Sequence, residues 1–246
     1  MGIWYKNTFY EANRIAFRLA LRAYFRIEVI GARQIPRTGA LIVASNHASA
    51  LDPVLIGTYV PRQVTFLAKE ELFRPPLSWY LRFMGTESIR RGRADVGALR
   101  AALRALEREE VVILFPEGTR TRTGGLAPGK PGLGKIVVAS GATVVPAWVG
   151  GSFCALPAGA RLPRPMKIRV AFGAPIPPSH WGDVPDAREG YAEISRRVMR
   201  EIFTLSEQYA ITSTQPFLEE SRRNLSLGSA GADASGGSAK TSSSYR

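Results

Sequence analysis

Two histidines occur in the chain, so only His47 and His180 could supply an imidazole as a general base. His180 follows two prolines and a serine in a loop-like segment, where a solvated or capping role is expected. His47 follows the apolar run 40–44 and precedes Asp52 by five positions, across what reads as a tight turn. The carboxylate could hold one ring nitrogen and leave the other facing a cleft. Because an unperturbed imidazole has a pKa of about 6.5 and is mostly neutral at pH 7, His47 is a candidate general base.

Asp52 also has a purely structural interpretation. Pro53 suits the first position of a helix and Asp52 suits the N-cap before it, so the carboxylate could serve only as a helix cap. The spacing of His47 and Asp52 by itself fits both interpretations.

A second polar segment follows the strongest buried-strand signal of the chain. Residues 111–115 (VVILF) lead directly into the sequence Pro-Glu-Gly-Thr-Arg. In open α/β sheets, ligands bind beyond the carboxyl ends of the strands, where this segment and His47 would both lie. Arg120 could grip a phosphate, Gly118 would let the backbone approach a ligand, and Glu117 could hold a hydroxyl or the arginine. The alternative is a polar turn with a surface salt bridge.

Further cations are expected at neighbouring strand ends. Lys69 ends the apolar run 64–68, and the segment 85–93 (GTESIRRGR) contains Arg91. A phosphate bound at one mouth would meet several positive charges, each charge-assisted hydrogen bond contributing about 1.5–3 kcal/mol. For any one of these residues a solvated basic patch is the alternative.

Apolar runs alternate with helical periods along the chain. The expected strands are 40–44, 64–68, 111–115, 143–149 and 167–172, and the expected helices are 192–203 and the one that carries Leu99, Leu103 and Leu106. This alternation predicts an α/β fold, a single domain with a mostly parallel sheet flanked by helices. We expect the domain to cover 28–205 and residues 206–246 to form a low-complexity, disordered tail, rich in Gly, Ser and Ala over 227–244.

Residues 1–27 predict a basic amphipathic helix. Its arginines recur every four residues and its aromatic and leucine side chains occupy another arc of the wheel: Arg14, Arg18, Arg22 and Arg26 against Phe17, Leu21, Tyr24 and Phe25. One interpretation places it in a headgroup layer, with the aromatics inserted and the arginines facing anionic lipid. The other packs it on its own domain with the arginines in water. The uncharged stretch 136–160 is broken by glycines, serines and a proline, so we expect no membrane-spanning segment.

The 33 basic and 20 acidic residues give a net charge of +13. A basic chain favours polyanionic partners, which leaves nucleic acid, anionic membrane and phosphorylated small molecules as candidates. The single cysteine, Cys154, excludes an internal disulfide, and one Cys with two His predicts no closed zinc site. Residues 124–130 (GGLAPGK) have the glycine spacing of a P-loop, but Pro131 replaces its Ser or Thr, so we do not expect nucleotide hydrolysis.

Four segments occur in the order and approximate spacing of the motifs of one known family. They are Asn46-His47 to Asp52, 85–91, 115–120 and 144–147. Over about 27–176 the chain resembles the glycerophospholipid acyltransferase family, most closely its bacterial 1-acylglycerol-3-phosphate acyltransferases. It departs from residues common in that family at Arg90, Thr121 and Gly129.

The resemblance implies transfer of a fatty acyl group from acyl-CoA or an acyl-carrier protein to the free hydroxyl of lysophosphatidic acid. It implies that His47 deprotonates the hydroxyl and that Asp52 holds the imidazole. No covalent acyl-enzyme, metal or redox cofactor is expected. The implied substrate-binding residues are Lys69, Arg91 and Arg120 for the phosphate, with Glu117 and Gly118 shaping the glycerol pocket.

With a membrane-seeking helix, such an enzyme would be peripheral on the cytoplasmic face of the cell membrane and bind its anionic surface. Glycerol 3-phosphate and a lyso-ornithine lipid are alternative acceptors. A basic nucleic-acid-binding module would also account for the charge, but the bases are dispersed and form no recognised nucleic-acid motif. A catalytically silent lipid-binding scaffold is the third alternative.

Overall fold

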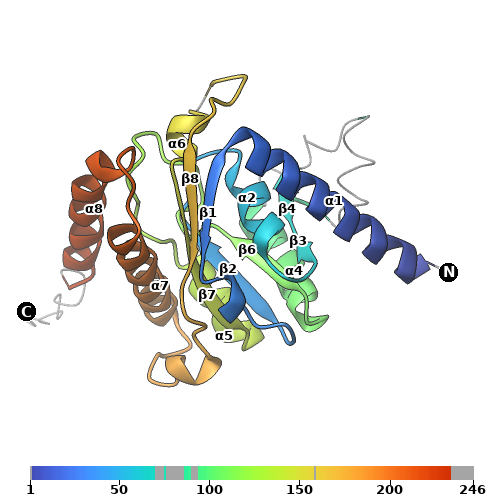
Figure 1. Ribbon diagram of the computed structural model, residues 1–246. Coiled ribbons are helices and arrows are strands. Elements are labelled where there is room, and N and C mark those ends of the chain that lie inside the picture. The colour runs from blue at the N-terminus through green and yellow to red at the C-terminus, as the bar shows by residue number, and fades with distance from the viewer. Residues whose placement is uncertain (1, 70–74, 76–85, 90–93, 158, 234–246) are drawn as a thin grey trace, which may run out of the picture.

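The computed structural model describes residues 2–69, 75, 86–89, 94–157 and 159–233. Its main sheet has six strands in the order β1-β8-β7-β2-β6-β3. They are β1 (Arg26–Ile30), β2 (Leu41–Ser45), β3 (Val64–Thr65), β6 (Val111–Leu114), β7 (Thr143–Gly150) and β8 (Lys167–Phe172). Every neighbouring pair is parallel except β7 with β8, and helices flank the sheet (Figure 1). The predicted single α/β domain with a mostly parallel sheet is confirmed.

Alternation along the strands divides the core between the two faces of the sheet. Leu41 and Val43 of β2 belong to a cluster with α1 and α2, whereas Ile42 and Ala44 belong to a cluster with α4, α5 and α7. The helices, including two short 3-10 helices, are α1 (Gly2–Tyr24), η1 (Ala32–Gln34), α2 (Asp52–Tyr59), α4 (Ala94–Glu107), α5 (Gly132–Ser140), α6 (Ser152–Ala155), η3 (Pro178–Trp181), α7 (Arg188–Gln208) and α8 (Gln215–Asp233). The helices predicted around Leu99–Leu106 and over 192–203 are α4 and α7, each longer than expected.

The predicted strand 64–68 is two short strands in different sheets. β3 pairs with β6, whereas β4 (Leu67–Lys69) pairs with β5 (Glu87–Ile89) in a separate two-stranded sheet. Between them, the Phe66 ring packs on α2, where a Cβ added to Gly57 would lie 2.5 Å from it. This packing separates the two strands, and Lys69 ends the smaller sheet.

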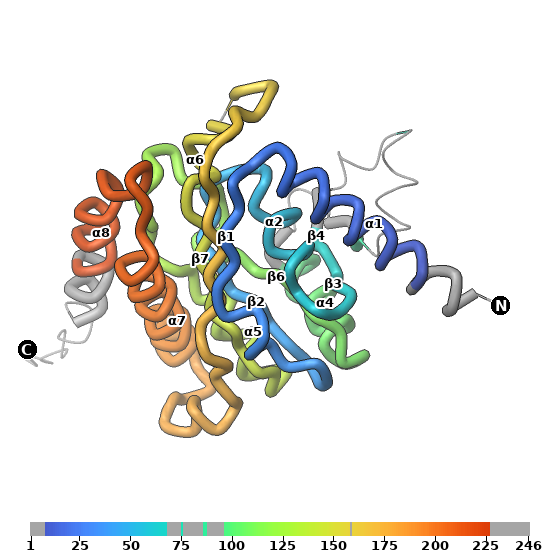
Figure 2. The backbone as a smooth tube through the Cα atoms, in the orientation of Figure 1, coloured from blue at the N-terminus to red at the C-terminus, as the bar shows by residue number. Residues whose placement is uncertain are grey.

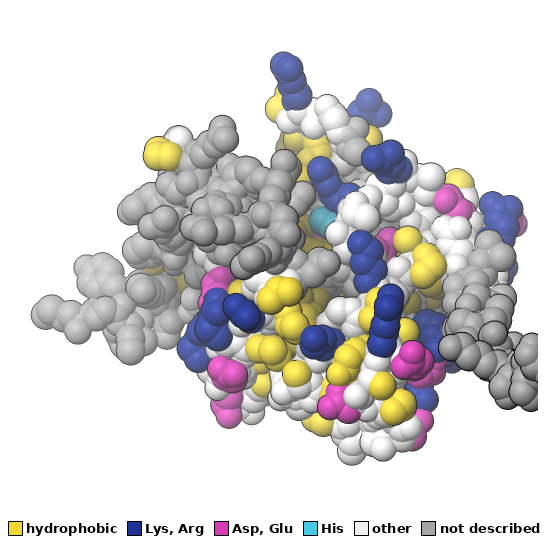
Figure 3. All heavy atoms as spheres, turned by 180° about the vertical axis from the view of Figure 1, so that it is seen from behind, with side chains coloured by type: hydrophobic (Ala, Val, Ile, Leu, Met, Phe, Trp, Pro, Cys, Tyr) yellow, Lys and Arg dark blue, Asp and Glu magenta, His cyan; other side chains and the backbone are white. Residues whose placement is uncertain are grey.

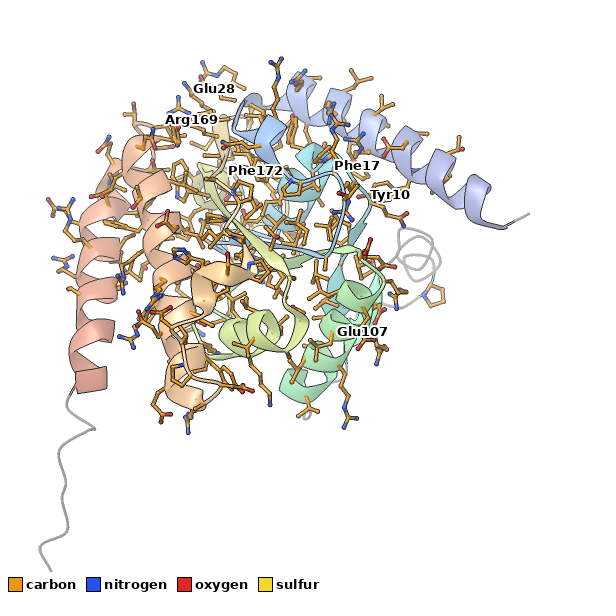
Figure 4. All side chains as sticks on the ribbon, turned by 90° about the horizontal axis from the view of Figure 1, so that it is seen from below. Tyr10, Phe17, Glu28, Glu107, Arg169 and Phe172 are labelled. Atoms are coloured by element: carbon orange, nitrogen blue, oxygen red, sulfur yellow. The ribbon has the colours of Figure 1, made fainter. Side chains whose placement is uncertain are left out.

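Helix α1 packs on its own domain, but with a different orientation from the one expected. Leu21 and Phe25 are buried, and Tyr10 and Phe17 lie on the side of the helix that faces the domain (Figure 4). Arg18 is half-buried and turned toward the domain: it donates to the carbonyl of Thr58, near the C-terminal end of α2, and lies over the ring of Tyr59. A cation there offsets the unpaired carbonyl groups of a helix end.

The prediction of a disordered tail from residue 206 is wrong for the part that the structure describes. α7 continues to Gln208, and α8 packs beside it on the opposite side of the domain from α1 (Figure 2). Phe217, Ser221 and Leu225 recur every four residues and form the face that meets the domain. A stripe of one aromatic, one serine and one leucine is too sparse to read as an amphipathic helix from the sequence. Residues 234–246 lie outside the described residues.

The uncharged stretch 136–160 is divided among α5, β7 and α6, with Gly141 and Gly151 at the breaks, whereas Pro146 lies inside β7 and does not interrupt it. Across the described ranges, no helix combines the length and apolarity that crossing a bilayer requires.

Candidate active site

Strand register brings the two main polar segments together. Ala44 of β2 lies beside Leu114 of β6 in parallel register, so the residues that follow leave the sheet at the same edge. There the rings of His47 and Phe115 stack, with centroids 4.0 Å apart and planes 19° from parallel. The predicted meeting of these segments beyond the strand ends is confirmed.

Asp52 holds the imidazole of His47. Its Oδ2 lies 3.1 Å from His47 Nδ1 and accepts the backbone N–H groups of Ala48 and Ser49, both at 2.7 Å. The carboxylate is fully buried, whereas the His47 side chain is 19% exposed. With Nδ1 facing Asp52, Nε2 is the ring nitrogen left to accept a proton.

The capping interpretation of Asp52 is wrong. Helix α2 begins at Asp52 itself, and its N-cap, Leu51, has no side-chain bond to the helix. The Asp52 carboxylate instead turns back to the residues before the helix, where it orders the turn that carries His47.

The backbone of His47 is held on both sides by the segment after β6. Its N–H donates to Glu117 Oε1 at 2.9 Å, and its carbonyl accepts the N–H of Thr121 at 2.8 Å. Glu117 is buried, and its Oε2 accepts the N–H of Ala127 at 3.1 Å. Each carboxylate oxygen therefore binds a backbone group, where we expected a substrate hydroxyl or Arg120.

Burial raises the pKa of Glu117 to about 7, against the lowering effect of its two backbone donors. Because this pKa is raised above the ordinary 4.5, the stability that Glu117 contributes is fully present below about pH 4.5 and is lost as the pH rises through about 7. The free energy of unfolding of the wild type, minus that of Glu117→Gln, should fall over this range by at most about 3 kcal/mol. Urea unfolding at several pH values measures this difference. An exposed control, Glu219→Gln, should show no such slope, and a flat difference for Glu117→Gln would contradict the expectation.

The loop that follows β6 carries three cations, Arg120, Arg122 and Lys130. Arg120 is exposed, and its side chain has no hydrogen bond or ion pair in the described part of the chain. Gly118, at φ +73°, leaves room for the side chain of Lys130: a Cβ added to Gly118 would lie 2.9 Å from Lys130 Nζ. The N–H of Lys130 donates to the carbonyl of Pro116 at 2.8 Å, which returns the chain to this loop.

Lys130 was not among the predicted site residues. Its only signal in the sequence was a lysine at the end of the P-loop-like segment, and that segment does not continue from a strand as a P-loop would. Its contact with Gly118 depends on how the loop folds back, which the spacing of the two residues in the sequence does not show.

The remaining two predicted phosphate ligands stay predictions. Lys69 ends β4 beside Ile89 of β5, but only its backbone position is described. Arg91 lies outside the described residues.

A small open pocket flanks the His47 turn at Asn46 and Ala48. Asn46 holds the start of the His47 turn against β7, since its side-chain amide accepts the N–H of Val149 at 2.8 Å and donates to the Val149 carbonyl at 3.1 Å. The apolar lining includes Leu126, Trp148, Val149, Phe153, Phe217 and Leu218. No group of three or more His, Cys, Asp or Glu side chains that could bind a metal occurs among the residues whose positions are described.

Comparison with known proteins gives consistent matches. A family model described as Acyltransferase matches residues 26–150. The 1-acyl-sn-glycerol-3-phosphate acyltransferase of Cocos nucifera is 31% identical over 144 residues, covering 57% of this chain and 47% of the relative. The protein of the same name from Bacillus subtilis is 24% identical over 199 residues, covering 80% and 96%. The chain spans about half the length of the plant relatives that it matches.

Among solved structures, the 1-acyl-sn-glycerophosphate (LPA) acyltransferase PlsC from Thermotoga maritima is similar, with a TM-score of 0.70 and 28% identity. The match covers 84% of this chain and 83% of that one. The likeness covers a larger share of the chain than the segment matched by the family model.

Proposed function

Because this chain belongs to the Acyltransferase family, we propose that it transfers a fatty acyl group from a thioester to the free hydroxyl of 1-acylglycerol 3-phosphate, forming phosphatidic acid. The observation that carries the proposal is the His47 and Asp52 pair, a buried carboxylate on Nδ1 of a partly exposed ring. The names of the relatives from Cocos nucifera and Bacillus subtilis support the same reaction.

In the proposed reaction, His47 Nε2 accepts the proton of the acceptor hydroxyl while the oxygen attacks the thioester carbonyl. The new C–O ester bond forms and the C–S bond breaks. The departing thiolate takes the proton from the imidazolium, which restores the neutral ring. Asp52 stabilises the imidazolium between these steps, because its buried carboxylate lies on Nδ1. Acyl-CoA or an acyl-carrier protein is the proposed donor.

The decisive experiment is an assay of thiol release. Purified protein with acyl-CoA or acyl-carrier protein and lysophosphatidic acid should release thiol and form phosphatidic acid in equal amounts. Glycerol 3-phosphate and a lyso-ornithine lipid complete the acceptor panel. Absence of thiol release with every donor and acceptor would overturn the proposal.

Arg120 is proposed to bind the acceptor phosphate, with Lys69 and Arg91 as further ligands and Gly118 leaving space for the headgroup. Arg120→Ala should raise the KM for lysophosphatidic acid about 10- to 100-fold, since a charge-assisted hydrogen bond contributes about 1.5–3 kcal/mol. Initial rates measured over a range of lysophosphatidic acid concentrations give this KM. Arg37→Ala, at the opposite end of β2, is the matched control and should change KM less than twofold. Equal KM values in both variants would remove Arg120 from the phosphate site.

The nucleic-acid alternative has less support. Among the described side chains on the face seen in Figure 3, those of Lys and Arg are interspersed with acidic and hydrophobic groups. Steeply salt-dependent DNA binding without thiol release would favour that alternative.

We also propose that α1 contacts an anionic membrane, through a different face from the predicted one. Leu21 and Phe25 are buried, whereas Ile15 is 52% exposed and Leu19 65% exposed. Together with exposed alanines they follow helical spacing: Ala12, Ile15, Ala16, Leu19 and Ala23. This stripe and the net charge of +13 fit an interfacial helix on the cytoplasmic face of the membrane.

Replacing both Ile15 and Leu19 by glutamate should weaken binding to anionic vesicles about 10-fold or more, because burying each side chain contributes about 1.5–3 kcal/mol. Sedimentation with vesicles of phosphatidylglycerol and phosphatidylcholine measures it. Val96→Glu changes an exposed apolar residue of α4 and serves as the control. Unchanged sedimentation of the double variant would refute the role of this face.

A further inference from the structure

Helix α8 is fastened to the loop that follows the Phe-Pro-Glu-Gly-Thr-Arg segment. Both backbone groups of Leu126 bind it: the N–H donates to Ser221 Oγ at 2.8 Å, and the carbonyl accepts Asn224 Nδ2 at 2.9 Å. The Phe217 ring packs over Gly124, where an added Cβ would lie 2.8 Å from it. Gly124 has φ +95°, so this close approach needs glycine both for space and for conformation.

The same loop is one residue away from the groups that hold His47. Ala127 follows Leu126, and its N–H donates to Glu117 Oε2, while Glu117 Oε1 accepts the N–H of His47. The contacts thus run without a break from α8 through Leu126, Ala127 and Glu117 to the backbone of His47.

We propose that Ser221 and Asn224 are positioning residues for the catalytic base, acting through Glu117. This inference rests on the proposed function and concerns a helix outside residues 26–150, the range matched by the family model. α8 keeps the Ala127 N–H on Glu117 Oε2, which leaves Oε1 in place for His47.

The burial of Glu117 makes this coupling effective. The side chain is 3% exposed, so an oxygen that loses its backbone donor has little access to water. A buried charged group without a partner is costly, and the carboxylate would turn or shift to recover one. Either movement displaces the backbone of His47. Because small misplacements of a catalytic group reduce rates strongly, the helix influences turnover without touching substrate.

The experiment compares the full-length Ser221→Ala/Asn224→Ala variant with Glu219→Ala, which changes an exposed residue of the same helix. We expect kcat to fall about 5- to 20-fold with the KM of both substrates within about twofold. We also expect the amides of His47 and Ala127 to exchange with deuterium about 10-fold faster, whereas amides in β2 keep their protection. Asn224→Asp retains size but loses the donor. If the double variant folds poorly, Asn224→Asp replaces it and should also lower kcat and speed amide exchange at His47 and Ala127.

A double-mutant cycle with Glu117→Gln separates coupling from general packing. If α8 acts through Glu117, Ser221→Ala should lower kcat in the wild type and change it less than twofold in the Glu117→Gln background. Independent, multiplicative effects would overturn the inference, as would unchanged exchange at His47. The exchange measurement needs no substrate, so failure of the proposed function is seen separately, as absence of thiol release by the wild type.

Discussion

His47→Ala is expected to lower kcat for acyl transfer by about 10²- to 10⁴-fold, the usual contribution of a positioned general base. Nε2 of the ring is the atom that would take the proton, and no other histidine belongs to the site. The KM for the acceptor should change little, because the proposed phosphate ligand is Arg120 and not His47. Residual turnover would come from positioning of the two substrates.

Thiol release at saturating substrate measures this loss, and circular dichroism verifies the fold of the variant. His180→Ala is the matched control, since His180 is exposed in η3 and its ring packs edge-on against Trp181. It should retain wild-type turnover. If folded His47→Ala does so as well, the proposed mechanism is wrong.

Asp52→Asn is expected to have an effect of similar size, about 10²- to 10⁴-fold in kcat. The amide is neutral and cannot stabilise the imidazolium as the buried carboxylate does. It also presents an NH₂ group at one of the two positions that the oxygens occupied. His47 Nδ1 and the N–H groups of Ala48 and Ser49 all converge on Oδ2, so any rotation of the amide disturbs all three contacts.

This variant also separates orientation of the base from a role in folding alone. If Asp52 only stabilised the helix start, Asp52→Asn would change the free energy of unfolding little, because Asn caps helices about as well as Asp, and it would leave kcat of the folded protein unchanged. Urea unfolding and the rate at saturating substrate, measured on the same samples, distinguish orientation of the base from a role in folding alone. Asp183→Asn, on an exposed ion pair with Arg197, is the matched substitution and should leave kcat at the wild-type value.

The meeting of His47 with the segment after β6 was predictable because it follows from local pattern and a general rule of topology. The runs 40–44 and 111–115 are apolar throughout, which indicates buried parallel strands, and parallel strands end at a common edge. The role of Glu117 was not predictable. Its partners are backbone N–H groups of His47 and Ala127, and backbone groups carry no residue-type signal.

The sequence also did not show which face of α1 or of α8 packs on the domain. Residues 1–27 read as an amphipathic helix, but periodicity shows only which residues share a face and not which face packs on the domain. Arg18 turned inward because the end of α2 offers it an unpaired carbonyl and the Tyr59 ring. In α8, the small polar residues that resembled a flexible tail are the ones that bond to Leu126.

The sequence by itself determined the α/β class, the strands that carry the site, and the His47 and Asp52 pair, because periodicity and short spacings are local properties of the chain. The tertiary structure decided which groups hold the base and which cations reach the loop after β6. Glu117, Ala127, Lys130 and Ser221 act through contacts between distant segments, and only the packed chain brings those segments within hydrogen-bond distance.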